Sequence, residues 1–367
     1  MTTRITPPTP PPVPPHLWTV ILAGGVGSRF WPASTPARPK QLLPLASERP
    51  LIRDTVDRIV PLVPEERLRI LTGPHLAEPI LAALPELGPG NLLLEPAARG
   101  TAPVLAWAAA EIERRDPDAV MVSLHSDHVI HPPEAFRALI ARAAELAESQ
   151  RRLFTIGAVP TRPETGYGYI RVGDELPRAE SESGAGDPGY EVARFVEKPD
   201  RATAEEYLAS GEYLWNTGLF VWRASDLLDE IERVSPELAE LVPIARAGGT
   251  EEFFALAPTI AIDHAVLERS KRVGVVRATF DWDDVGAWDA LARTRGVEGR
   301  DNCVIGEAFA VQSSGTTVYA EGGPVVAFGV EDLVIVRTGG VTFVTHRDRT
   351  QDLKALLAEL PDSLRNL

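Results

Sequence analysis

The sequence predicts an α/β fold, in which a doubly wound parallel sheet is followed by a small β-rich region. Three observations lead to this fold class. Between residues 17 and 159, short apolar runs typical of strands alternate with patterns typical of helices. After residue 160 the alternation gives way to strand-like runs around a polar, glycine-rich stretch. From residue 302 onward, short β-like runs are separated by glycine turns.

The first region consists of repeated β-α units. Strands are expected at 17–23, 67–72, 91–95, 119–124 and 153–159, and helices between them at 50–60, 75–84, 101–115 and 133–149. Apolar strands joined by helices are typical of a parallel sheet that helices cover on both faces. Residues 165–172 and 189–199 are expected to form two further strands, so that a mixed sheet region covers one side of the cleft.

The remaining elements are small. One helix is expected after Trp288, followed by strands at 302–306, 316–322, 332–338 and 341–346 and a closing helix at 350–359. The even spacing of these short strands suits a coiled, β-helix-like arrangement. The predicted organisation is a disordered tail at 1–16, in which residues 7–15 hold seven prolines, then a domain at 17–295 and a β-rich domain at 296–367.

Composition excludes several classes of protein. Of 367 residues, 37 are lysine or arginine and 52 are aspartate or glutamate, and the net charge of −15 argues against nucleic acid or an anionic membrane as a partner. The single Cys303 excludes an internal disulfide and a cysteine-based zinc site, and we expect it to be buried. Without a secretory signal or an apolar run of about 18 residues, the sequence predicts a cytoplasmic protein.

A glycine-rich turn follows the first predicted strand. Its glycines would let backbone N–H groups approach phosphate oxygens, and Arg29 and Lys40 follow as cations. The turn matches neither the dinucleotide fingerprint, whose third glycine position is Phe30 here, nor the Walker A loop. Taken alone, such a turn favours the simpler interpretation of a tight turn that carries surface cations.

Two acidic segments follow later strands. "LHSDHVIH" at 124–131 holds three histidines and Asp127, which suggests a Mg²⁺ ligand, a transition-metal site or an Asx turn with surface histidines. "DWDDVGAW" at 281–288 gathers further carboxylates between tryptophans. Two acidic loops and one cationic glycine loop are the parts that metal-assisted nucleotidyl transfer requires.

The stretch "LAGGVGSRFWPAS…RPKQLLPL" resembles the signature of the sugar-nucleotide pyrophosphorylases, and "FWPAS" followed by "PKQ" resembles the mannose-1-phosphate guanylyltransferases among them. Seven further motifs match in the same order, at 94–103, 125–130, 165–170, 195–199, 215–222, 262–268 and 281–288. The resemblance implies a Rossmann-like, GT-A-like nucleotidyltransferase domain that converts GTP and mannose 1-phosphate to GDP-mannose and pyrophosphate with Mg²⁺. A sugar-phosphate oxygen would attack the α-phosphate in line, so no protein nucleophile is needed.

The resemblance also implies the site residues. Arg29, Lys40, Asp127 and Asp284 are the expected catalytic residues, and the two aspartates are the expected metal ligands. The nucleotide would be bound by Leu22, Ala23, Gly24, Gly25, Gly27, Ser28, Arg29, Lys40, Glu95, Arg99, Gly100, Thr101, Ser126 and Asp127. The sugar phosphate would be bound by Gly168, Glu197, Lys198, Asn216 and Asp284.

Base choice has a separate physical basis. Guanine presents two adjacent donors, N1–H and the N2 amino group, and one ionised carboxylate accepts from both. Glu95, at the end of a predicted strand, is the residue expected there; the alternative is a carboxylate that stabilises a helix start near Thr101. Two departures from the family stand out. Gly100 replaces an asparagine and is expected to loosen the base loop, and His125 replaces a proline and adds a softer metal ligand.

Several alternatives stay open from the sequence. The sugar 1-phosphate could be a heptose, a fucose or another hexose phosphate, and a glycosyltransferase or a non-catalytic sensor could share this scaffold. Replacing Asp284 by alanine should abolish turnover in an enzyme of this kind. The sequence leaves the oligomeric state open, a homodimer included. Because the chain ends at 367, without the additional domain of bifunctional relatives, one activity is expected.

Overall fold

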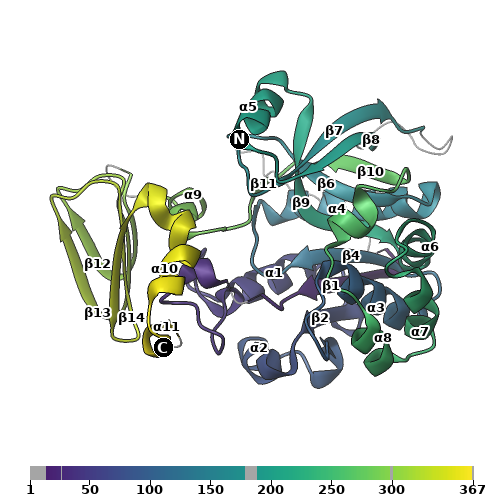
Figure 1. The fold of residues 1–367 in the computed structure, drawn as a ribbon, viewed down its shortest axis with the longest axis horizontal. Coiled ribbons are helices and arrows are strands. Elements are labelled where there is room, and N and C mark those ends of the chain that lie inside the picture. The colour runs from purple at the N-terminus through teal and green to yellow at the C-terminus, as the bar shows by residue number, and fades with distance from the viewer. Residues whose placement is uncertain (1–13, 26, 178–187, 298–300, 366–367) are drawn as a thin grey trace, which may run out of the picture.

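The computed structural model describes residues 14–25, 27–177, 188–297 and 301–365 (Figure 1). Most of the predicted N-terminal tail and part of the polar stretch after residue 173 lie outside these ranges. The chain folds into a large α/β domain and a smaller domain of β-strands at its C-terminal end. Among the described residues, no helix is long and apolar enough to cross a membrane.

A nine-stranded mixed sheet forms the centre of the large domain, in the order β3-β2-β1-β4-β9-β6-β10-β8-β7. The first four of these strands in spatial order run parallel, and β6 and β10 are also parallel to each other. The strands are β1 (Leu17–Leu22), β2 (Leu68–Thr72), β3 (Leu92–Leu94), β4 (Val120–His125), β6 (Leu153–Ala158), β7 (Gly168–Glu175), β8 (Tyr190–Glu197), β9 (Tyr213–Arg223) and β10 (Val273–Arg277).

Strand β9 makes the sheet mixed. It runs antiparallel between β4 and β6, and most of its side chains are buried. Its sequence, "YLWNTGLFVWR", is apolar on both faces, as a strand at the centre of a covered sheet requires. The predicted mixed sheet is confirmed, although its central antiparallel strand was not among the predicted elements.

Helices cover both faces of the sheet, which confirms the doubly wound prediction. One apolar core lies under α1 (Leu51–Ile59), α2 (Ala77–Ala83) and α4 (Pro133–Gln150). The other lies under α3 (Thr101–Glu113), α6 (Ala224–Val234), α7 (Val242–Arg246) and α8 (Thr250–Leu256). Helix α3 is apolar nearly all round and buries most of its length, Trp107 included, because α6 and α7 pack on its outer side. Helix α5 (Arg201–Ser210) lies beside β9.

The C-terminal domain coils. Strands β12 (Cys303–Val311), β13 (Thr317–Phe328) and β14 (Leu333–Thr338) pair in parallel, and β15 (Val341–His346) closes the sheet antiparallel to β14. The connections between the parallel strands are too short for crossover helices, so each strand starts a new turn of a coil. Cys303 is buried, as expected.

One helical prediction is confirmed and another needs correction. After Trp288 the chain makes a 3-10 turn and then the expected helix, the short α9 (Leu291–Thr294). The closing helix α10 (Leu353–Glu359) begins three residues later than predicted, because Arg347–Asp352 form a 3-10 helix; α11 (Asp362–Arg365) follows it. The boundary placed between residues 295 and 296 stays a prediction.

An apolar core joins the two domains. Phe30 packs on Trp288 with ring centroids 5.0 Å apart, and Trp288 packs in turn on Tyr319 of β13 at 5.3 Å. Trp31 meets Phe343 of β15 edge to face at 5.7 Å. Figure 1 shows α10 on the side of the C-terminal strands that faces the large domain. The segment that follows the glycine loop is therefore packed against the C-terminal domain.

Candidate active site

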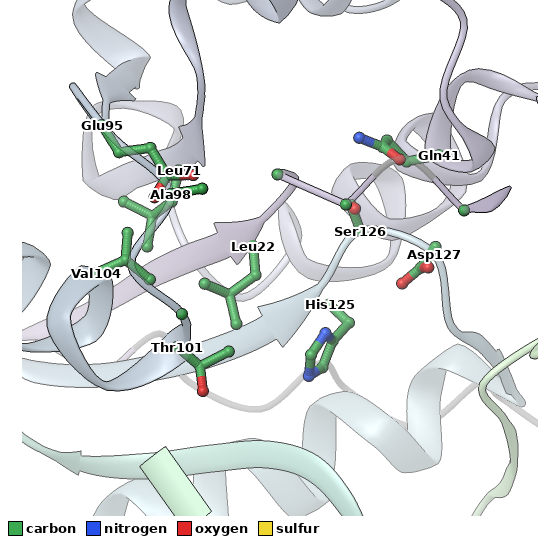
Figure 2. A pocket seen from close by; sticks show the side chains of 14 residues that line it. Leu22, Gln41, Leu71, Glu95, Ala98, Thr101, Val104, His125, Ser126 and Asp127 are labelled. Atoms are coloured by element: carbon green, nitrogen blue, oxygen red, sulfur yellow. The ribbon is translucent and has the colours of Figure 1, made fainter. Parts of the chain in front are cut away.

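A cavity of about 350 Å³ opens at the carboxyl ends of β1 and β4, where open α/β sheets bind ligands. Figure 2 shows Glu95 and Asp127 at opposite sides of it. The sequence-predicted residues that line it are Leu22, Gly24, Gly25, Gly27, Glu95, Gly100, Thr101, Ser126 and Asp127. Sequence reasoning did not name Gln41, Leu71, Ala98 and Val104 as lining residues, and had considered His125 only as a metal ligand.

Two glycines let charged side chains approach the loop. A Cβ on Gly27, whose φ is 70°, would lie 2.3 Å from the Cβ of Lys40. A Cβ on Gly24 would lie 2.8 Å from Glu95 Oε1, so this carboxylate lies directly against the loop backbone. Only glycine fits these two positions without displacing a neighbour, which explains Gly24 and Gly27, whereas a Cβ on Gly25 would meet open space.

Lys40 links the loop to both acidic segments. Its side chain is buried, and Nζ donates to the main-chain oxygen of Asp284 at 2.6 Å and forms an ion pair with Asp127 Oδ2 at 2.8 Å. A buried ammonium needs such partners, since an isolated charge in a protein interior is strongly unfavourable. Lys40 thus lies between the two aspartates that the sequence singled out.

Strand pairing brings the acidic segments together. Asp127 ends the turn after β4, and Asp284 follows β11 (Asp281–Asp283). Strand β11 pairs antiparallel with β5 (Val129–His131), and Trp282 lies opposite Ile130. This two-stranded sheet places residues from positions more than 150 apart in the chain at one end of the cavity.

The backbone around Asp284 is held in an unusual conformation. Val285 has a φ of 48°, which is rare for a β-branched residue, and its N–H donates to Asp283 Oδ1 at 2.8 Å. Arg293 Nε donates to Asp283 Oδ2 at 2.9 Å. The Asp283–Arg293 pair therefore supports the strained turn that orients Asp284.

The surroundings of Asp127 and Asp284 shift the pKa values of their carboxyl groups in opposite directions. Burial raises the pKa of Asp127, but the Lys40 ammonium together with His128 and His125 outweighs burial and lowers this pKa to about 2. Burial raises the pKa of Asp284 above its ordinary value despite the same ammonium. Tyr167 O–H donates to Asp284 Oδ1 at 2.5 Å, and burial together with this carboxylate raises the pKa of Tyr167, which keeps its proton.

The donor atoms fit a divalent cation. Asp127 and Asp284 offer carboxylate oxygens, the hard ligands that Mg²⁺ prefers. His125, Asp127 and His128 also place one ligand atom each within 4.8 Å of one another. However, His128 Nδ1 already accepts from Trp282 Nε1 at 3.1 Å, and its ring stacks on that of His125. One ring nitrogen of His128 is therefore already bonded within the protein.

A second group of predicted residues gathers beside β7, β8 and β9. Gly168 lies opposite Glu197, and a Cβ on Gly168 would lie 2.5 Å from Glu197 Oε2. Lys198 Nζ donates to Glu197 Oε1 at 2.7 Å. Asn216 accepts from Thr155 Oγ1 at 2.9 Å, so its amide is oriented by the strand beside it.

Sequence reasoning missed Tyr167 and Asp263 as members of the site. Asn216 Nδ2 donates to Asp263 Oδ1 at 2.9 Å, and burial together with the Glu197 charge raises the pKa of Asp263 to about 6. Both residues lie inside motifs quoted for the resemblance, and that was the only signal available for them. His264, which follows Asp263, contacts Glu268.

Other predicted residues lie outside the cavity wall. Ala23 is buried and its carbonyl accepts from Gln41 Nε2, Ser28 begins a 3-10 turn, and Arg99 Nε donates to the main-chain oxygen of Phe254 at 3.1 Å. Arg29 Nη1 donates to Gln351 Oε1 of the C-terminal domain at 3.3 Å.

Gly100 does not loosen its loop. It has a φ of 83°, and a Cβ there would lie 2.6 Å from the main-chain oxygen of Ile260. Ala102 N–H donates to this same oxygen at 3.1 Å, and Ile260 N–H donates to Arg99 O at 3.1 Å. Because Gly100 has no side chain, Ile260 can approach closely and form hydrogen bonds that fix the loop. The expectation of a looser loop was therefore wrong.

Comparisons with known proteins agree with this architecture. The family model "Nucleotidyl transferase" matches residues 18–296, and "MannoseP isomerase/GMP-like beta-helix domain" matches residues 306–360, which confirms the β-helix-like prediction. The xanthan biosynthesis protein XanB of Xanthomonas campestris pv. campestris strain B100 is 38% identical over 361 residues, 95% of this chain and 74% of that protein.

Two further proteins extend the comparison. A mannose-1-phosphate guanylyltransferase of Escherichia coli K12 is 37% identical over 360 residues, 94% of this chain and 73% of its own length. A crystal structure from Thermus thermophilus, described as a mannose-1-phosphate geranyltransferase, superposes with a TM-score of 0.84 at 35% identity and covers 94% of this chain and 99% of that one.

Proposed function

Because the chain belongs to the nucleotidyl transferase family, we propose that it converts GTP and α-D-mannose 1-phosphate to GDP-mannose and pyrophosphate. The observation that carries the proposal is the cavity, in which a glycine loop faces one carboxylate suited to guanine and another suited to a metal. Relatives named mannose-1-phosphate guanylyltransferase, similar over most of this chain, support the choice of sugar and base.

Glu95 is the proposed guanine contact. It lines the cavity on the side away from Asp127, and its carboxylate lies against Gly24. Burial raises the pKa of Glu95, so a ligand that donates two hydrogen bonds to it would favour its ionised form. Guanine N1–H and N2–H are such a pair of donors.

The phosphates would lie along the glycine loop. In the reaction a sugar-phosphate oxygen attacks the α-phosphorus of GTP, the bond between the α-phosphorus and the bridging oxygen breaks, and pyrophosphate leaves with that oxygen. Lys40 would lie beside this path, since it contacts Asp127 and the Asp284 carbonyl. Arg29 would add a second cation to the charge that builds on the leaving group.

Asp127 and Asp284 would hold the divalent metal that members of the family generally use, and we propose Mg²⁺. When bound, the metal would neutralise negative charge on the reacting phosphates. Tyr167 keeps one oxygen of Asp284 in a hydrogen bond and so sets the direction of the other. Glu197, Lys198 and Asn216 are the proposed contacts to the sugar phosphate.

A substrate panel tests the proposal. Pyrophosphate release would be measured with GTP, ATP, UTP and dTTP, each crossed with mannose, glucose, fucose and heptose 1-phosphates. We expect the highest kcat/KM for GTP with mannose 1-phosphate. Incubation with GDP-mannose, Mg²⁺ and pyrophosphate should form GTP, whereas a glycosyltransferase would form none. Absence of GTP in that reverse assay contradicts the proposal.

The Glu95→Gln substitution tests the base contact. Replacing an ionised acceptor by an amide should lower kcat/KM for GTP at least about tenfold, the value of one charge-assisted hydrogen bond. Glu78→Gln, on the exposed face of α2, is the matched control and should leave it unchanged. Unaltered GTP activity in the Glu95 variant contradicts the assignment.

The Asp284→Ala substitution tests the metal ligand. Turnover should fall at least about a hundredfold, because charge neutralisation at the reacting phosphates is lost. Asp281→Ala, an exposed position of the same segment, is the control. Wild-type turnover in the Asp284 variant would overturn the metal assignment. The homodimer stays a prediction, which sedimentation analysis would test.

A further inference from the structure

A second cavity lies beside the loop that carries Asp127. It has a volume of about 260 Å³ and is formed by α1, α4, β5 and residues 46–49. It shares no lining residue with the nucleotide cavity. The function proposed above assigns it no role.

Arg58 is the unusual residue of this cavity. Its side chain is buried, with 8% of the residue exposed, yet no carboxylate forms an ion pair with it among the described residues. Nη2 donates to the main-chain oxygen of His128 at 3.1 Å, and the guanidinium lies over the ring of Phe136. Burial lowers the pKa of Arg58 to about 10, so the group remains a cation at neutral pH. The Asp54 carboxylate, one helical turn earlier on α1, offsets this charge in part, and the direct hydrogen-bond acceptor is a neutral carbonyl, so the buried cation is incompletely compensated.

A second guanidinium adjoins the first. Arg137 of α4 lines the same cavity, and its Nη1 donates to the main-chain oxygen of Arg58 at 3.1 Å. Its other contact is with Glu134 at 3.1 Å, and the Glu134 side chain is 65% exposed. This ion pair is therefore solvent-screened and leaves the Arg137 charge largely uncompensated.

The carboxylates of the cavity already have partners. Asp54 contacts Arg49 Nη2 at 2.7 Å and accepts from Ser47 Oγ at 2.7 Å. Asp57 contacts Arg49 Nη1 at 2.5 Å and Arg53 Nη2 at 3.0 Å. The ion pairs of these carboxylates are thus formed with Arg49 and Arg53, and Asp54 interacts with Arg58 only at longer range.

We propose that this cavity binds a phosphate group between Arg58 and Arg137. Guanidinium groups bind phosphate through paired N–H donors, and a buried one does so most strongly because water competes least. The volume leaves room for a free phosphate ion or for a phosphate on a small organic group. The site does not depend on the proposed transferase activity, since it involves none of the residues assigned to that reaction.

The bound group would lie next to the metal-binding loop. Arg58 holds the carbonyl of His128, the residue after Asp127, and the His128 ring is in turn bonded to Trp282 of β11. A ligand on Arg58 is therefore one side chain away from the turn that positions the Asp127 carboxylate.

Anomalous diffraction locates the site directly. Crystals of the full chain would be soaked in tungstate, an electron-dense analogue of phosphate, and the anomalous map inspected in both cavities. We expect a peak between the Arg58 and Arg137 guanidinium groups. A map with peaks only at the glycine loop, or with no peak in this cavity, overturns the proposal.

Binding in solution provides the second test. Inorganic phosphate and glycerol 3-phosphate would each be titrated calorimetrically into the wild type, Arg137→Gln and Arg53→Gln. Arg53 lies on α1 beside the cavity without lining it, so it controls for loss of one positive charge. We expect Arg137→Gln to weaken binding at least about tenfold and Arg53→Gln less than about twofold. Tighter binding of one ligand identifies the source of the phosphate; equal affinities in all three proteins overturn the proposal.

Discussion

Asp263 should make the stability of the protein fall as pH rises. Its carboxyl group is largely buried beside Glu197, and its pKa is raised from an ordinary value of 3.8 to about 6. Between these two values the folded protein binds a proton that the unfolded chain has lost, so raising the pH favours unfolding. The Asp263→Asn substitution removes this proton uptake, and its amide oxygen can still accept from Asn216 Nδ2.

The expected size of this stability change follows from the pKa shift of Asp263. A rise of the pKa from 3.8 to about 6 corresponds to about 3 kcal/mol, which is the full cost of ionising Asp263 in the folded protein at high pH. At pH 5 about half of this cost has already developed. The stability gained by the asparagine variant should therefore grow by about 1 kcal/mol between pH 5 and pH 8.

Denaturant unfolding at the two pH values measures this growth. The free energy of unfolding would be determined for the wild type, Asp263→Asn and the control Asp118→Asn, whose side chain is 69% exposed. The control should show the same difference from wild type at both pH values. If the Asp263 variant also shows a constant difference, the carboxyl group is not perturbed by burial and the reasoning is refuted.

Two further substitutions test how the site is built. Gly27→Ala should lower the free energy of unfolding by at least about 2 kcal/mol, because φ is positive there and the new Cβ would meet Lys40 Cβ at 2.3 Å. Arg293→Gln should lower it by about 2 kcal/mol, since it removes the charged donor to Asp283 that supports the strained Val285, and turnover should fall with it.

Denaturant unfolding and steady-state kinetics measure both effects, with one control each. Gly90→Ala adds a Cβ into open space and should change the free energy of unfolding by less than about 0.5 kcal/mol. Arg349→Gln removes an exposed ion pair with Asp352 and should be similarly neutral. Equal stabilities for Gly27→Ala and Gly90→Ala, or for Arg293→Gln and Arg349→Gln, contradict the respective explanation.

The pattern of apolar runs predicted the parallel half of the sheet well. Strands β1 to β4 and helices α1, α3 and α4 lie within a few residues of the predicted ranges, because buried strands and helices with a regular apolar face or a long apolar run leave strong local signals. No local pattern in the sequence of β9 indicated its position between β4 and β6. Its antiparallel insertion between β4 and β6 depends on contacts with residues about 60 to 100 positions earlier in the chain.

Local sequence was also insufficient for parts of the candidate site. The glycine loop and the acidic segments could be predicted because their residue types are unusual for those positions. The role of Gly100 could not, since it depends on the Ile260 carbonyl, which approaches from another part of the chain. Asp263 was likewise an ordinary aspartate in the sequence, and only the fold places it beside Asn216 and Glu197.

The contacts between the two domains bear on how the protein is synthesised. Trp31 packs on Phe343 and donates to the main-chain oxygen of Leu364, and Arg29 donates to Gln351. These partners are synthesised after the whole of the large domain, whereas domains usually fold in order from the N-terminus. The segment behind the glycine loop therefore obtains its packing partners only after the C-terminal domain has been made. A nascent chain should acquire the parallel sheet before the glycine loop is fully packed.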